Sequence, residues 1–107
     1  PFNAPQKLLK LIDDKDYGKY EVKALGSVPV NFIANLDITN GNSVSATINR
    51  NFELVGIAFD GMLETIIADY RYIPQARTIS VDSRYMLWTL DKFHVAENIL
   101  NELTITN

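Results

Sequence analysis

The chain has 107 residues, of which 47% are hydrophobic and 21% charged, and 10 Lys and Arg against 13 Asp and Glu give a net charge of −3. This length and apolar content predict one globular segment over residues 1–107 and exclude a disordered or low-complexity class. The charge provides no basic stripe for nucleic acid, and no apolar run approaches the roughly 20 residues that a membrane span needs.

The N-terminal part is predicted to begin with a short helix over residues 6–14, with Asn3 as its cap. Its apolar stripe consists of Leu8, Leu9 and Ile12. A polar connection follows over residues 17–27. Residues 28–36 then alternate apolar and polar side chains, as a half-buried strand does, and Pro29 places the start of that strand at its end or at a sheet edge.

The middle of the chain is predicted to hold a loop and a β-hairpin. Residues 38–45 are too polar and too rich in turn-forming residues for regular structure. Two strands follow with a turn at residues 49–51, and the second strand ends at residues 60–61. Another short strand is predicted over residues 77–81.

The C-terminal part is predicted to form one long amphipathic helix. Asp82 or Ser83 can cap its first turn, and apolar residues recur with the helical period to the end. The stripe consists of Met86, Leu90, Phe93, Ala96, Ile99, Leu100 and Leu103. The order helix, strand, loop, hairpin, strand, helix predicts an α+β fold in which strands predominate.

One loop carries a chemical signature, because residues 37–43 read Asp-Ile-Thr-Asn-Gly-Asn-Ser. It resembles the nucleophile loop of chymotrypsin-like serine peptidases, where two backbone N–H groups form the oxyanion hole. On this resemblance Ser43 is the nucleophile, and Gly41 and Ser43 supply the two N–H groups. Taken alone, the motif is found more often in an ordinary polar turn.

Many collinear runs, from residue 5 to residue 103, match one known family. They are residues 5–8, 15–18, 29–32, 37–39, 41–43, 53–61, 77–82, 84–85, 87–88, 90–93 and 98–103. In these runs the chain resembles the C-terminal segment of the dipeptidyl-peptidase 7 and dipeptidyl-peptidase 11 family of bacterial serine peptidases.

The resemblance implies an enzyme that releases dipeptides from the free N-termini of peptides. It also implies that this chain is the C-terminal part of a chymotrypsin-like double β-barrel. The family's serine falls on Ser43 and its oxyanion glycine on Gly41. Asp60 falls on the aspartate that binds the substrate's terminal ammonium, a cation that needs a carboxylate partner when desolvated. The next position carries arginine in subfamilies that prefer acidic residues, so Gly61 implies a hydrophobic second substrate residue.

The nucleophile loop departs from the family pattern Thr-Gly-Gly-Asn-Ser-Gly-Ser-Pro at three positions. Asn40 replaces the first glycine, Val44 the glycine after the serine, and Ala46 the proline. Asn40 is the mildest change because asparagine tolerates left-handed backbone. Val44 is the most consequential, since a β-branched residue accepts positive φ badly and would distort the oxyanion hole.

The sequence predicts no base for Ser43 within these residues. The family's histidine and aspartate lie far upstream of its serine, and the single histidine, His94, is expected to be a bystander on the terminal helix. The chain is therefore expected to be inactive alone and to associate with the upstream part of the peptidase or with a second copy. Two alternatives stay open: a degenerate, non-catalytic structural or dimerisation module, and a module that binds peptide N-termini through Asp60.

Neither a metal nor another cofactor is expected. The chain has no cysteine and one histidine, which excludes cysteine-based zinc sites and an all-histidine metal cage. Asp37 and Asp60 could form a carboxylate pair, but solvated positions are the more frequent outcome for such residues. Family members are exported, so the resemblance implies a periplasmic or surface location, although the first residues show no signal-peptide pattern.

Overall fold

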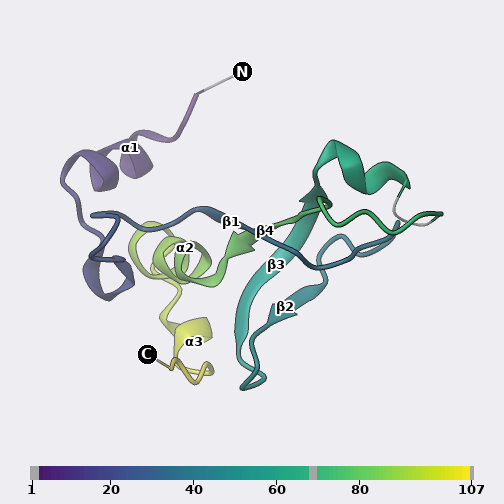
Figure 1. Cartoon of the computed structure of the whole chain (residues 1–107). Coiled ribbons are helices and arrows are strands. Elements are labelled where there is room, and N and C mark those ends of the chain that lie inside the picture. Colours follow the sequence, from purple (N-terminus) through teal and green to yellow (C-terminus); the bar gives the residue numbers. More distant parts are fainter. Residues whose placement is uncertain (1–2, 68–69, 107) are drawn as a thin grey trace. The chain divides into compact units, whose positions relative to one another are not determined.

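A computed structural model describes residues 3–67 and 70–106 (Figure 1). The described residues of Pro1–Pro29 and Arg84–Asn107 form one compact unit, called here the helical unit, and those of Val30–Ser83 form a second, the sheet unit. The elements are α1 (Gln6–Asp13), η1 (Gly18–Tyr20), β1 (Asn31–Ala34), β2 (Ala46–Ile48), β3 (Leu54–Gly61), η2 (Leu63–Ile67), β4 (Thr78–Asp82), α2 (Ser83–Trp88), η3 (Thr89–Phe93) and α3 (Glu97–Leu100). The η segments are short 3₁₀ helices, except η3, which is a π-helix.

The sheet unit contains a four-stranded antiparallel sheet in the order β1-β4-β3-β2. The predicted hairpin of β2 and β3 is present (Figure 1). In its register Ala46 lies opposite Ile57. Ile57 is also opposite Val81, which pairs on its other side with Asn31. This places β3 and β4 at the centre of the sheet and confirms the predicted α+β class. The chymotrypsin-like barrel stays a prediction.

Small and polar side chains fill the inside of the sheet unit. The buried residues with a side chain are Thr47, Ala58, Thr78, Ser80 and Asp82. The hydroxyl groups of Thr47 and Ser80 are hydrogen-bonded at 3.0 Å, and the Thr78 hydroxyl donates to the carbonyl oxygen of Leu36 at 2.7 Å. These bonds offset the cost of removing hydroxyl groups from water.

Gly56 lets an aromatic ring lie directly on the backbone of β3. A Cβ atom at this position would lie 2.6 Å from Cε1 of Phe32 and 2.6 Å from the carbonyl oxygen of Val81. Such distances are far below van der Waals contact. The centre of the sheet therefore requires glycine here.

The helical unit has an aromatic core made of Tyr20, Val28 and Trp88, which are 3%, 7% and 2% exposed. The ring of Trp88 lies 5.8 Å from that of Tyr85 and 6.3 Å from that of Tyr17, centroid to centroid. Such offset pairs add to the free energy gained by burying the ring area. The apolar residues packed around the core are Leu8, Leu11, Tyr17, Tyr85 and Leu87.

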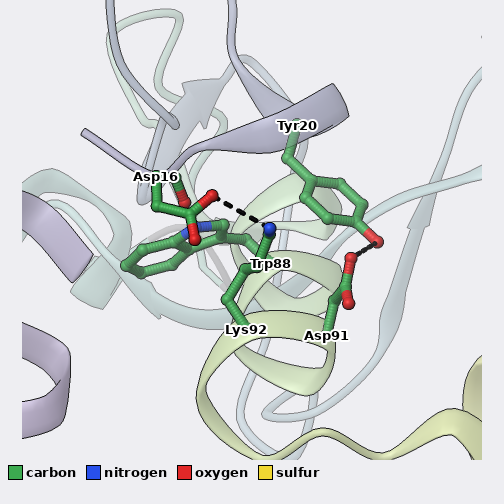
Figure 2. A network of polar contacts seen from close by, with 5 residues as sticks. All are labelled: Asp16, Tyr20, Trp88, Asp91 and Lys92. Atoms are coloured by element: carbon green, nitrogen blue, oxygen red, sulfur yellow. Dashed lines mark hydrogen bonds and ion pairs between the residues drawn. The ribbon is translucent and has the colours of Figure 1, made fainter. Parts of the chain in front are cut away.

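Polar contacts surround this core (Figure 2). The Trp88 indole N–H donates to the backbone oxygen of Asp16 at 2.8 Å, and the Asp16 carboxylate pairs with Lys92 at 2.9 Å. The hydroxyl of Tyr20 donates to the Asp91 carboxylate at 3.0 Å. Burial raises the pKa of Tyr20 to about 12, and the bond to Asp91 and its charge act in the same direction. The network ties α2 and η3 to the segment around η1.

Two N-terminal predictions need correction. The helix begins at Gln6 as predicted, but Asn3 is not its cap: Pro5 occupies the cap position and makes no side-chain bond. The first strand is shorter than the predicted 28–36, because β1 covers only Asn31–Ala34. Val28 lies instead in the core of the helical unit.

The predicted single C-terminal helix is wrong beyond Phe93. The turn widens in η3, so that the N–H of His94 bonds to the oxygen of Thr89 at 2.9 Å and that of Ala96 to Leu90 at 2.8 Å. Val95 then adopts a φ of 54°, which no α-helix accommodates. The chain resumes a short helix at α3. The apolar period continues across this break and therefore suggested a continuous helix.

Candidate functional site

The loop over residues 38–45 has no regular structure, as predicted, but its own hydrogen bonds hold it. The Asn42 side chain accepts a bond from the N–H of Thr39 at 2.8 Å, and the N–H of Asn42 donates back to the oxygen of Thr39 at 3.2 Å. The N–H of Ser45 donates to the oxygen of Asn42 at 2.9 Å. Asn42 thus shapes the turn that presents Ser43, which is exposed.

Among the described residues, two of the backbone N–H groups around Ser43 are bonded and two are not. Those of Asn42 and Val44 donate to Thr39 and Ala58. Within residues 3–67 and 70–106, those of Gly41 and Ser43 donate to no other protein group. The same two residues are the ones expected to form the oxyanion hole. Two unbonded N–H groups beside an exposed hydroxyl are what a developing oxyanion requires.

Val44 adopts the left-handed conformation that the sequence analysis identified as unfavourable for it. Its φ is 71° and its side chain is 76% exposed. Its N–H bonds to the oxygen of Ala58 at 2.8 Å, and the N–H of Ala58 bonds to the oxygen of Ser45 at 2.9 Å. These two bonds to β3 hold the valine in a region that costs an L-residue about 1–2 kcal/mol. Backbone strain is therefore stored next to Ser43.

A surface pocket of about 500 Å³ lies between this loop, the end of β3 and η2. Residues 38–43 line one side, and residues 59–62 line another together with Leu63, Thr65 and Ile66. The four predicted site residues all line it: Gly41, Ser43, Asp60 and Gly61. The structure thus brings together residues that are up to 20 positions apart in the sequence, since 61 − 41 = 20. Asp37 lines a neighbouring hollow instead.

Asp60 lies where β3 deviates from regular pairing. The register with β4 shifts between Ala58 and Asp60, which is a β-bulge or a similar irregularity. One carboxylate oxygen of Asp60, Oδ1, accepts a hydrogen bond from the N–H of Gly61 at 2.8 Å. In the described part of the chain no cation pairs with Asp60, which is exposed. Asp60 lines the pocket, and its carboxylate has no partner of opposite charge among those residues.

Thr65 is a pocket residue that the sequence analysis missed. Its hydroxyl donates to the oxygen of Met62 at 2.6 Å, and its N–H donates to the same oxygen at 2.8 Å. A Cβ atom on Gly61 would lie 2.4 Å from the Thr65 hydroxyl oxygen. Neither periodicity nor motif in the sequence indicates that η2 turns back over Gly61.

His94 lies in the helical unit, whereas Ser43 lies in the sheet unit. The histidine is exposed, and its ring meets the ring of Phe93 edge-on at 4.7 Å between centroids. It is not among the residues that line the pocket.

Among residues 3–67 and 70–106, no three His, Asp or Glu side chains gather as metal ligands would. No helix in those ranges combines the length and apolar character needed to cross a membrane.

The chain matches one family model, described as peptidase S46, over residues 1–105. It is 43% identical to the dipeptidyl-peptidase 7 of Capnocytophaga gingivalis over 105 residues, which cover 97% of this chain and 14% of that protein. It is 38% identical to an Asp/Glu-specific dipeptidyl-peptidase of Shewanella putrefaciens, over 98% of this chain and 17% of that protein.

The fold is also similar to a solved structure. The crystal structure of Porphyromonas endodontalis DPP11 in complex with substrate matches with a TM-score of 0.89 and 37% identity, over 94% of this chain and 15% of that one. A second crystal structure of the same protein, in an alternate conformation, matches with a TM-score of 0.86. The chain therefore spans only a small part of the length of the proteins that it matches.

Proposed function

This chain belongs to the peptidase S46 family, and from that premise we propose that it carries the nucleophile and part of the substrate cleft of a serine-type dipeptidyl-peptidase. The enzyme would release dipeptides from the N-termini of peptides. The chain would supply the C-terminal part of a chymotrypsin-like double β-barrel and would require no metal or other cofactor.

The observation that carries this proposal is the shared pocket. Ser43 presents an exposed hydroxyl at its edge, and the unbonded N–H groups of Gly41 and Ser43 are available to an oxyanion. In the proposed reaction the Ser43 oxygen attacks the carbonyl carbon of the second peptide residue. The hydroxyl proton of Ser43 would pass to the base, and the two N–H groups would stabilise the negative charge that develops on the carbonyl oxygen. The C–N bond after the second residue would then break, and the rest of the peptide would leave as an amine that takes up this proton. Water would finally release the dipeptide from Ser43.

Asp60 would fix the register of the substrate. An exposed carboxylate at the pocket, oriented by the N–H of Gly61, suits the α-ammonium group of a peptide. Binding the terminal ammonium at a fixed distance from Ser43 would place the second peptide bond at the nucleophile. The enzyme would then release dipeptides rather than single amino acids.

We place the side chain of the second substrate residue against Gly61 and the apolar residues beside it, Met62, Leu63 and Ile66. No basic side chain lines this pocket in the described residues, so an acidic substrate residue would have no cationic partner. The proposed preference is therefore hydrophobic. Overall sequence identity does not decide between an acidic and a hydrophobic preference. The Asp/Glu-specific dipeptidyl-peptidase is 38% identical to the chain, and the dipeptidyl-peptidase 7 is 43% identical.

The 107 residues alone are proposed to be inactive. A serine nucleophile needs a base within hydrogen-bond reach, and the single histidine of the sequence, His94, is not a pocket residue. The base would come from an upstream part of the peptidase. Association with that part, or with a second copy, and a periplasmic or surface location belong to the same proposal.

A second candidate function is supported by one observation. Val44 holds a left-handed conformation beside the nucleophile, where the family carries glycine. If this strain prevents the oxyanion hole from forming, the chain is a degenerate, non-catalytic structural or dimerisation module.

A chimera separates the two candidates. In the Capnocytophaga gingivalis dipeptidyl-peptidase 7, the segment that aligns with this chain is replaced by it. We expect labelling by a fluorophosphonate and hydrolysis of a fluorogenic dipeptidyl substrate with a hydrophobic second residue. Ser43→Ala should reduce turnover by about 10⁴-fold or more, whereas Ser45→Ala, an exposed serine of the same loop, should leave it nearly unchanged.

Each result has a defined meaning. Labelling of the isolated chain that disappears in Ser43→Ala would contradict the proposed inactivity. A folded chimera without labelling would favour the degenerate module, and labelling restored by Val44→Gly would assign the loss to the strain at Val44. Asp60→Asn should raise the KM for peptides with a free N-terminus, and an unchanged KM would remove Asp60 from the binding site.

A further inference from the structure

Gly61 and Thr65 form a sterically coupled pair at the wall of the pocket. A Cβ atom on Gly61 would lie 2.4 Å from the hydroxyl oxygen of Thr65 and 3.1 Å from both its Cβ and Cγ2 atoms. All three side-chain heavy atoms of the threonine therefore surround the space that a side chain at position 61 would enter.

Thr65 cannot move out of this space without losing a bond. Its hydroxyl donates to the oxygen of Met62 at 2.6 Å, and its backbone N–H donates to that oxygen at 2.8 Å. Rotation about χ1 would break the hydroxyl bond and bring another substituent of the same Cβ toward Gly61. The turn at the start of η2 thus holds the threonine against the glycine.

We infer that Thr65 is a second specificity-determining residue of the pocket and acts only together with Gly61. The inference rests on the proposed function. Thr65 fills the room beside the glycine, so the wall stays free of longer side chains and the apolar residues of η2 remain accessible to the substrate. A charged side chain at position 61 needs a smaller residue at position 65 as well.

The test combines unfolding of the 107-residue chain with binding of two dipeptides. The variants are Gly61→Arg, Thr65→Gly and their combination. Gly61→Arg together with Thr65→Val is the matched control, because valine keeps the bulk of threonine. Thr65→Ala serves if Thr65→Gly does not fold. Binding of Val-Leu and Val-Asp is followed by NMR shifts of the backbone amides.

We expect Gly61→Arg alone to lower Tm by about 4 °C or more, since it forces Thr65 out of place. Adding Thr65→Gly should recover most of that loss, whereas adding Thr65→Val should not. The unmodified chain should prefer Val-Leu, and the Gly61→Arg, Thr65→Gly combination should prefer Val-Asp by about tenfold, as a new ion pair would allow.

Two failures are distinguishable. In the first case, Gly61→Arg keeps the Tm of the unmodified chain and binds Val-Asp without any change at Thr65. This result overturns the coupling between Gly61 and Thr65 but leaves the proposed peptide site intact. In the second case, Thr65→Gly recovers the Tm lost in Gly61→Arg, but no variant binds either dipeptide. This result overturns the proposed peptide site and, with it, the role of Thr65 in specificity.

Discussion

The two units of this chain bury different kinds of side chain. The helical unit buries Tyr20, Val28 and Trp88, and the rings of two further tyrosines pack on the tryptophan. In the sheet unit Ala58 is the only buried hydrophobic residue among the described residues, and the other buried side chains of that unit are hydroxyl groups and the carboxylate of Asp82. The pocket belongs to the sheet unit.

The large apolar side chains of the sheet unit are mostly on its surface. The most exposed are Val44 (76%), Phe52 (85%), Leu63 (78%), Ile66 (69%), Tyr70 (92%) and Tyr72 (80%). Val44 and Phe52 also have positive φ. The site-bearing unit thus combines weak burial with local strain, a combination that is common where function is performed. The helical unit instead buries large aromatic side chains in its own core.

The largest expected effect tests the aromatic core. Trp88→Ala should lower the free energy of unfolding by about 3–5 kcal/mol, because it opens a cavity and removes the hydrogen bond to the oxygen of Asp16. Trp88→Phe should cost clearly less, since it keeps most of the packing. Urea unfolding followed by circular dichroism measures both variants. Equal losses in the two would show that burial of the ring is not what stabilises this unit.

The next effect tests the centre of the sheet. Gly56→Ala should cost about 1–3 kcal/mol, because its methyl group would meet the ring of Phe32 and the oxygen of Val81. Gly26→Ala is the control, since nothing lies within 4 Å of a Cβ there and only its φ of 61° opposes alanine. If Gly56→Ala keeps the stability of the unmodified chain, close packing does not require glycine at this position.

A smaller effect separates strain at the site from strain elsewhere. Val44→Gly and Val95→Gly each replace a valine with a φ of 71° or 54° and should each raise stability by about 0.5–1 kcal/mol. In the chimera, only Val44→Gly should increase the rate of fluorophosphonate labelling. An equal increase with Val95→Gly would mean that strain beside Ser43 has no special effect on the nucleophile.

The last effect is a pH dependence of the helical unit. The pKa of Tyr20 is about 12 in the folded chain, against its ordinary value of 10.0. Below pH 10 the Tyr20 hydroxyl keeps its proton in both the folded and the unfolded chain, so its contribution to stability is complete. Between about pH 10 and 12 the unfolded state alone releases it, so stability should fall as the pH rises.

Tyr20→Phe provides the comparison for this titration. The variant lacks the hydroxyl that donates to Asp91, so its stability should decline less over the same interval. Lys10 and Lys92, whose carboxylate hydrogen bonds raise their pKa, titrate in both proteins and cancel in the difference. Denaturant midpoints of the unmodified chain and of Tyr20→Phe, measured at pH 9, 10 and 11, would test this difference. Parallel curves would remove Tyr20 from the alkaline response.

Much of the fold could be predicted because its signals are local. Alternation and turn residues located the hairpin and β4 to within a few residues, and the amphipathic stripe located α1. The family resemblance is confirmed over nearly the whole chain. Two errors occur where the apolar pattern does not reflect the local secondary structure. Val28 is predicted to lie in a strand but lies in the core of the helical unit. The C-terminal apolar stripe continues across Val95, where the helix is broken.

By itself, the sequence determined the family, the α+β class, the hairpin and the residue types of the proposed site, because motifs and short-range periodicity record these directly. Only the tertiary structure decided that Ser43 and Asp60 share a pocket, that Val44 is held left-handed by bonds to Ala58, and that Thr65 closes the space beside Gly61. Those facts depend on backbone register and on the direction in which η2 turns. Both arise from contacts between distant residues, which no local pattern specifies.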